Sequence, residues 1–83
     1  MSKHDKTIQQ ILSGRADASI KFKDILSLLT SLGFVMRVKG SHHIFRKEGV
    51  LDMVNIQKDG NMVKPYQVKQ IRAIFAEYNL IGE

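Results

Sequence analysis

The segment 37–47 combines two adjacent histidines, His42 and His43, with four side chains that are always positively charged. Histidine exchanges protons near neutral pH, which suits it to general acid–base catalysis. Arginine and lysine attract the phosphates of nucleic acids. Together these residue types indicate a protein that binds a nucleic acid and carries a group able to cleave it. The four cations are Arg37, Lys39, Arg46 and Lys47.

The composition sets the class of protein. A chain of 83 residues suffices for one small domain with a single core. Its net charge of +5 favours a polyanionic partner, although a basic domain without such a partner fits the same composition. The absence of cysteine excludes disulfides and thiol chemistry. No apolar run reaches the roughly 18 residues of a membrane span, and no signal sequence begins the chain, so we expect a cytoplasmic protein.

Three segments have apolar residues at helical spacing. The first, 5–12, is short and leads into a polar connector over 14–19. The second begins near Phe22 and ends at Gly33, a residue type that suits a helix C-terminus. The third begins at Pro65, since proline favours the first helical position. The apolar stripes are Ile8, Ile11 and Leu12; Phe22, Ile25, Leu26, Leu29 and Leu32; and Val68, Ile71, Phe75 and Tyr78.

Between the second and third helices, the segments 34–38, 42–47 and 50–57 read as strands. Tight connections at 39–41 and 48–49 predict an antiparallel sheet, and 58–61 reads as a turn. The expected fold is therefore α+β: an αβββα domain with a three-stranded antiparallel sheet, two helices on one face, and a short N-terminal helix. Double-stranded-RNA-binding domains have the same αβββα order of elements.

The chain resembles the HicA toxin family of bacterial toxin–antitoxin systems in two stretches, LLTSLGFVMRVKGSHHIFRKEG and KPYQVKQIRAIFAEYNL. The resemblance covers roughly residues 20–80. It implies a HicA-like domain over 20–83, preceded by an N-terminal extension over 1–19 to which we assign no function. The residues that carry it are Leu32, Gly33, Phe34, Arg37, Gly40, Ser41, His42, His43, Phe45 and the apolar and basic spacing from Val68 to Ile74.

The resemblance implies a function and a site. HicA proteins are small toxins that cleave mRNA through a double-stranded-RNA-binding-like fold, and a HicB antitoxin neutralises them. The expected partners are therefore mRNA and a HicB-type protein, with no membrane. The family's catalytic histidine follows Gly-Ser, which makes His42 the expected catalytic residue. The expected RNA-binding residues are Arg37, Lys39, Gly40, Ser41, Arg46, Lys47, Lys69 and Arg72.

RNA can be cleaved by its own 2′-hydroxyl, so we expect neither a metal nor another cofactor. The reaction needs a base, an acid and stabilisation of the charge at phosphorus. We expect His42 to transfer a proton, Gly40 to let the backbone approach the phosphate, and Ser41 to orient the histidine or a phosphate oxygen. Arg37, Lys39 or Arg46 would stabilise the charge. No metal-ligand motif is present.

Adjacent side chains of a strand point to opposite faces of the sheet. If Phe45 packs beneath the helices, His43 lies with it as a half-buried core residue, and His42 faces solvent beside Arg46. An inert surface histidine at position 42 is the alternative. Two other functions also fit: a non-catalytic RNA-binding module, which needs no histidine, and a degenerate toxin that retains only antitoxin binding.

Overall fold

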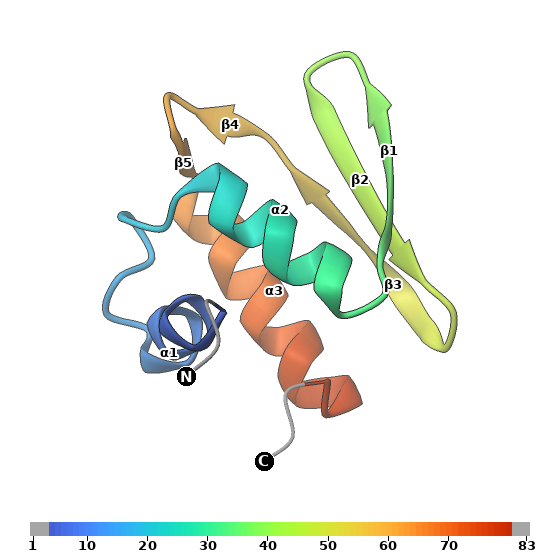
Figure 1. The fold of residues 1–83 in the computed structure, drawn as a ribbon, viewed down its shortest axis with the longest axis horizontal. Coiled ribbons are helices and arrows are strands. Elements are labelled where there is room, and N and C mark those ends of the chain that lie inside the picture. The colour runs from blue at the N-terminus through green and yellow to red at the C-terminus, as the bar shows by residue number, and fades with distance from the viewer. Residues whose placement is uncertain (1–3, 81–83) are drawn as a thin grey trace.

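Helices pack against one face of an antiparallel sheet in the computed structural model, which describes residues 4–80 (Figure 1). The three-stranded sheet has the order β1-β2-β3 and both pairings are antiparallel. The expected α+β class, the αβββα order and the short N-terminal helix are confirmed. The elements are α1 (Asp5–Ser13), α2 (Phe22–Ser31), β1 (Val35–Lys39), β2 (His42–Lys47), β3 (Val50–Ile56), β4 (Lys58–Asp59), β5 (Met62–Val63) and α3 (Pro65–Tyr78).

A second, two-stranded sheet occupies residues 58–63, of which the sequence indicated only a turn over 58–61. β4 pairs with β5, and Lys21 forms an antiparallel bridge to Met62 just before α2. The Phe22 N–H donates to the Asn61 carbonyl at 2.8 Å. The small hairpin therefore fixes the start of α2. Strands of two residues are too short to show an alternating pattern, so local sequence could not reveal them.

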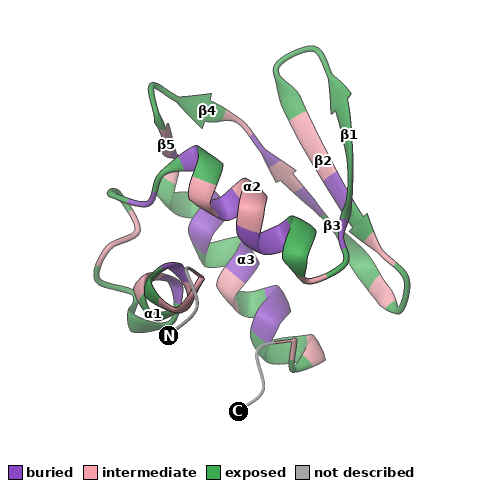
Figure 2. Ribbon diagram, viewed as in Figure 1, coloured by how far each residue is buried: buried purple, intermediate pink, exposed green. Residues whose placement is uncertain are grey.

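The core lies between the sheet and helices α2 and α3, where Figure 2 shows the buried segments. Phe45 of β2 is completely buried, and Val54 of β3 is nearly so. Burying an apolar side chain of this size contributes about 1.5–3 kcal/mol, so this layer supplies most of the stability of the fold. Its other members are Ile11, Ile20, Phe22, Ile25, Leu28, Leu29, Phe34, Ile56, Val63, Val68, Ile71, Ile74 and Phe75.

β1 lies at the edge of the sheet, beyond the helical layer. All five of its residues are exposed. Met36 and Val38 share the sheet face of Phe45 and His43, their cross-strand partners, yet they are 41% and 55% exposed. The helices therefore cover the inner face of β2 and β3 but leave both faces of β1 accessible to solvent.

Hydrogen bonds from Arg72 link α3 to α1 and to the connector that follows α1. Its Nη1 donates to the Ile11 carbonyl at 2.7 Å and to Asp17 Oδ1 at 3.0 Å, and its Nη2 donates to Asp17 Oδ2 at 3.1 Å. These hydrogen bonds lower the pKa of Asp17 despite its partial burial, and they raise the pKa of Arg72. The arginine thus joins segments 55 residues apart in the sequence.

Candidate active site

Gly40 and Ser41 form the two-residue connection between β1 and β2. Gly40 has a φ of +62°, and an added Cβ would meet no atom within 4 Å, so backbone conformation rather than space favours glycine here. Glycine at the first position is typical of type II′ hairpin turns, whose twist matches that of the flanking strands. The turn places Lys39 directly opposite His42 in the register.

His42 is exposed at the start of β2, and two amide side chains contact its ring. Its Nδ1 lies 3.0 Å from Asn55 Oδ1, and its Nε2 lies 3.4 Å from the amide nitrogen of Gln57. An amide oxygen only accepts hydrogen bonds, so in the neutral ring the contact with Asn55 favours the tautomer that carries its proton on Nδ1. In that tautomer Nε2 has the lone pair that a general base needs.

Polar contacts hold Gln57 beside His42. Its Nε2 donates to Ser41 Oγ at 3.4 Å, and its Oε1 accepts a hydrogen bond from Lys64 Nζ at 3.4 Å. Its backbone N–H donates to Oε1 of the buried Gln67 at 3.1 Å. This network connects the hairpin turn, the end of β3 and the start of α3, so residues far apart in the chain position the exposed imidazole.

A hollow of about 140 Å³ opens beside His42. Apart from His42 itself and the phenol of Tyr66, which is 62% exposed, the side chains that line it carry amides. Amide and hydroxyl groups can hydrogen-bond to the edges of bases and to the sugars of single-stranded RNA. Besides Tyr66, the lining residues are His42, Asn55, Gln57, Gln67 and Gln70.

The sequence analysis did not assign Asn55 or Gln57 to the site. A signal was present: both residues alternate with Val54 and Ile56, which are buried. A period of two places alternate residues on one face of a strand, and this face is the one that bears His42. The residues contributed by α3 show no comparable local signal, because they meet His42 only through the packing of the helix on the sheet.

Three cations lie on the solvent face of the sheet, which is the face that bears His42. The register pairs Lys39 with His42 and brings Arg37 and Arg46 to the same face. Cross-strand partners on one face lie about 4.5–5.5 Å apart at Cβ. The three cations help to line a shallow hollow of about 530 Å³. Among residues 4–80, no carboxylate lies within salt-bridge distance of any of them.

Three of the expected RNA-binding residues lie elsewhere. Lys47 points to the helix side of the sheet, with its Nζ 3.0 Å from the position of a Cβ added to Gly33, just after α2. A cation there complements the helix dipole. Arg72 bonds to Asp17, and Lys69 is exposed on α3. The structure places Lys39, Gly40 and Ser41 next to His42 and puts Arg37 and Arg46 farther along the same sheet face, but Lys47, Lys69 and Arg72 lie elsewhere.

His43 lies on the opposite side of the sheet from His42. Its ring packs edge-on against Phe22 of α2, with ring centroids 4.7 Å apart and an interplanar angle of 66°. Its Nδ1 is buried without a hydrogen-bond partner. The alternation predicted from the buried Phe45 is therefore confirmed. Only one of the two adjacent histidines presents its ring to solvent beside the sheet cations.

No cluster of three or more His, Cys, Asp or Glu side chains among residues 4–80 is arranged to hold a metal ion. Over the same residues, none of the helices combines the length and apolar character needed to cross a membrane. The groups that the structure does bring to His42 are amides, the hydroxyls of Ser41 and Tyr66, and the cation of Lys39.

These features define a class of protein: a small α+β domain with one exposed histidine on a cationic sheet face. The family described as "HicA toxin of bacterial toxin-antitoxin" matches residues 22–76, from the start of α2 almost to the end of α3. The chain therefore belongs to the HicA family of toxins from toxin–antitoxin systems, as the sequence resemblance predicted. No curated protein and no solved structure gives a significant match.

Proposed function

We propose that this HicA-family toxin is a metal-independent endoribonuclease that cleaves mRNA, with His42 as its general acid–base. The observation that carries the proposal is the setting of His42. Its Nδ1 lies 3.0 Å from Asn55 Oδ1, a contact that in the neutral ring leaves Nε2 as the proton acceptor, and Lys39 stands directly opposite on the same sheet face. A proton acceptor beside an unneutralised cation supplies the base and the charge stabilisation that cleavage by a 2′-hydroxyl requires, and water can supply the acid.

In the proposed reaction, the 2′-oxygen attacks the adjacent phosphorus while Nε2 of His42 accepts the hydroxyl proton. The bond from phosphorus to the 5′-oxygen of the next nucleotide breaks, and that oxygen takes a proton from water. The products are a 2′,3′-cyclic phosphate and a 5′-hydroxyl. Lys39 stabilises the negative charge that develops at phosphorus, and Ser41 in the turn orients a phosphate oxygen.

A non-catalytic RNA-binding module would use the same cations. It would have no use for a contact that orients the ring of His42 and favours one tautomer, so the hydrogen bond that Asn55 Oδ1 accepts from His42 Nδ1 favours the nuclease. A degenerate toxin that only binds its antitoxin would likewise need neither group. Both alternatives predict that replacing His42 leaves the behaviour of the protein toward RNA unchanged.

The test uses purified protein and an RNA oligonucleotide with a mapped cleavage position. We expect cleavage in excess EDTA and a cyclic phosphate detected by mass spectrometry. A single 2′-deoxy nucleotide at that position should block the reaction because it removes the nucleophile. The folded His42→Ala variant should bind the oligonucleotide but not cleave it. Full cleavage by His42→Ala, or activity that EDTA abolishes and one divalent ion restores, would contradict the proposal.

The proposal includes a HicB-type antitoxin that covers the sheet face around His42, and it places both proteins in the cytoplasm with their mRNA substrates. Masking this face blocks RNA binding and proton transfer together. Adding the antitoxin should therefore slow hydrogen exchange across residues 39–47, and complex formation should slow as salt rises because charge steering is screened over about 10 Å at 0.1 M salt. Inhibition without protection of 39–47 would indicate that the antitoxin acts elsewhere.

A further inference from the structure

Gln67 brings an unused hydrogen-bond donor to the hollow beside His42. The side chain lies near the start of α3, is 3% exposed and lines the hollow. Its Oε1 accepts a hydrogen bond from the backbone N–H of Gln57 at 3.1 Å. A backbone N–H only donates, so this contact fixes which end of the Gln67 amide is the oxygen. The amide nitrogen Nε2 then has no hydrogen-bond partner among residues 4–80.

The neighbouring amides also use their oxygens within the protein. Gln57 Oε1 accepts a hydrogen bond from the Lys64 ammonium group at 3.4 Å, and Asn55 Oδ1 lies 3.0 Å from His42 Nδ1. Asn55 Nδ2, like Gln67 Nε2, has no hydrogen bond within the part of the chain that the structure describes. The hollow therefore offers free donors to a ligand, and a buried donor without a partner is stabilised by an acceptor that reaches it.

Two exposed side chains complete the lining and add affinity rather than selectivity. The ring of Tyr66 can stack on any base, because every base has a π-face. Gln70 Nε2 donates to the Met53 carbonyl at 3.5 Å, and its oxygen is left to water because the side chain is exposed. Discrimination between ligands therefore depends on the buried Gln67.

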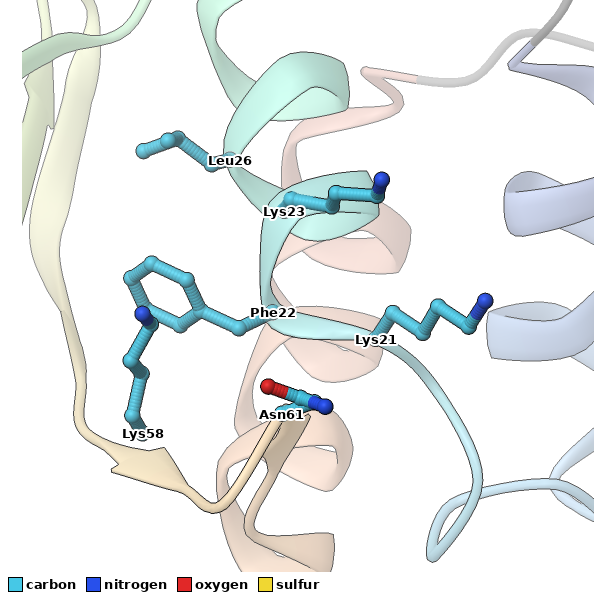
Figure 3. Close-up of a pocket in the computed structure, with 6 residues that line it drawn as sticks. All are labelled: Lys21, Phe22, Lys23, Leu26, Lys58 and Asn61. Carbon is cyan, nitrogen blue, oxygen red and sulfur yellow. The ribbon is translucent and has the colours of Figure 1, made fainter.

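The hollow at the start of α2 has no buried polar side chain among its lining residues. Its volume is about 410 Å³, against about 140 Å³ beside His42, and three lysines help to line it. Figure 3 shows the ammonium groups of Lys21 and Lys23 directed away from Lys58 and from the ring of Phe22. Specific sites are marked by polar groups that converge on the ligand, so the smaller hollow has the character of a binding site and the larger one does not.

Free donors match the edge of a base that carries only acceptors. Guanine presents O6 and N7 side by side, whereas adenine presents N7 beside an amino group that donates. Cytosine also places an amino group beside its acceptors, and uracil separates its two carbonyls by a donating N3–H. An amino group opposite Gln67 Nε2 sets donor against donor and leaves both unsatisfied. Single-stranded RNA exposes these edges, so the hollow favours guanine.

We propose that the hollow binds the guanine of the nucleotide whose 2′-hydroxyl attacks, and that Gln67 is the specificity-determining residue. In a ribose, the 2′-hydroxyl and the base are attached to neighbouring carbons, so a hydroxyl at His42 Nε2 carries its own base to this hollow. Gln67 donates to O6 and Asn55 Nδ2 donates to N7. The hollow has room for about five water molecules of about 30 Å³ each, which suffices for the edge of one base. The assignment to the attacking nucleotide rests on the proposed function.

The first test needs only the wild-type protein. The probes are adenosine heptamers whose central nucleotide is 2′-deoxy, which removes the nucleophile, and carries guanine, adenine, hypoxanthine or 2-aminopurine. Affinity is measured by fluorescence anisotropy. The guanine probe should bind about five- to 150-fold more tightly than the adenine probe. Hypoxanthine keeps O6 and N7 and should bind like guanine, whereas 2-aminopurine lacks O6 and should bind like adenine. Equal affinity for the guanine and adenine probes would overturn the inference.

The second test changes the donor. Gln67→Glu keeps an oxygen for the Gln57 N–H and replaces the donor nitrogen by an oxygen, so the guanine-to-adenine affinity ratio should fall to about one. Gln9→Glu makes the same change of charge on the exposed surface of α1 and should keep the wild-type ratio. Tyr66→Ala should weaken all four probes by about the same factor and also keep the ratio. A folded Gln67→Glu protein with the wild-type ratio would refute the role of Gln67.

Mapping of the cleavage positions in a long RNA of mixed sequence separates this inference from the proposed function. We expect cuts on the 3′ side of guanosine. A wild-type protein that prefers the guanine probe but cleaves no RNA would refute the nuclease proposal and leave the base site intact. Cleavage after all four nucleotides alike, with equal binding of the guanine and adenine probes, would overturn the base site and leave the nuclease proposal intact.

Discussion

The solvent face of the sheet and the junction between α1 and α3 contain similar side chains in different situations. At the junction, Arg72 gives its hydrogen bonds to Asp17 and to a backbone carbonyl. On the sheet face, Arg37 and Lys39 have no carboxylate partner among residues 4–80. The two histidines differ in the same way, since His43 packs against Phe22 while His42 stays exposed.

The difference shows that the partners of a polar side chain, and not its type, indicate its use. A cation already bonded to a carboxylate has little attraction left for a phosphate, whereas an unpaired cation on a solvent face keeps its full charge for a ligand. The sheet face should therefore determine activity, and the junction should determine stability. Substitutions that change one property without the other test this separation.

The largest effect is expected from exchanging the two histidines one at a time for phenylalanine. His42→Phe should lower the rate of RNA cleavage by about 10²–10⁴-fold, the usual contribution of a general acid–base. His43→Phe should retain cleavage, because it keeps a ring against Phe22 and removes a buried nitrogen that has no partner. Single-turnover cleavage and thermal unfolding measure the two properties on the same samples.

His43→Ala completes this comparison. It removes the edge-on contact with Phe22. The free energy of unfolding should therefore fall by about 0.5–1.5 kcal/mol, in addition to the loss caused by reduced apolar burial, while folded molecules still cleave RNA. A His43→Phe protein that melts like the wild type but fails to cleave would show that His43 participates in the chemistry, and the separation of the two sheet faces would be lost.

A smaller effect on activity is expected at Asn55. Asn55→Ala removes the acceptor that fixes the proton on Nδ1 of His42, and kcat should fall about five- to tenfold, since one hydrogen bond contributes about 1 kcal/mol. Asn55→Asp restores an acceptor and should restore kcat, but its negative charge repels RNA and should raise KM. An unchanged kcat in Asn55→Ala would show that the contact with Asn55 does not set the tautomer of His42 during catalysis.

The smallest effect is expected at the junction, and it concerns stability alone. The Arg72 guanidinium lowers the pKa of Asp17 in the folded protein, so the pair stabilises the fold above the unfolded value near 4 and loses this contribution as pH falls through the folded value. Asp17→Asn should lower the free energy of unfolding at pH 7 by about 1 kcal/mol and leave cleavage by folded molecules unchanged. The deficit, measured in urea, should shrink below about pH 4. A deficit that is equal at both pH values would mean that the charge of Asp17 does not stabilise the fold.

Local periodicity was sufficient to predict the main elements. The stripes beginning at Ile8, Phe22 and Val68 gave the three helices, and the buried Phe45 correctly placed His43 on the covered face and His42 on the solvent face. Such patterns can be read from the sequence because each element buries one apolar face, and the residues of that face recur every few positions.

Contacts between distant segments could not be predicted in this way. Arg72 looked available for RNA because nothing in its neighbourhood reveals Asp17, 55 residues earlier. Gln67 binds the backbone of Gln57 only because α3 crosses the end of β3. The exposure of β1 likewise depends on where the helical layer ends. Each of these features is set by tertiary packing, which local propensity does not encode.

The free edge of β1 has a consequence for solubility. An edge strand with exposed apolar side chains can pair with the same strand of another molecule, and Val35 is 72% exposed there. Arg37 and Lys39 interrupt the apolar run, and such charges discourage intermolecular pairing and aggregation. Substitutions that remove these cations should therefore lower the soluble yield as well as the affinity for RNA. Their effects on RNA binding can be interpreted only for the fraction that remains monomeric.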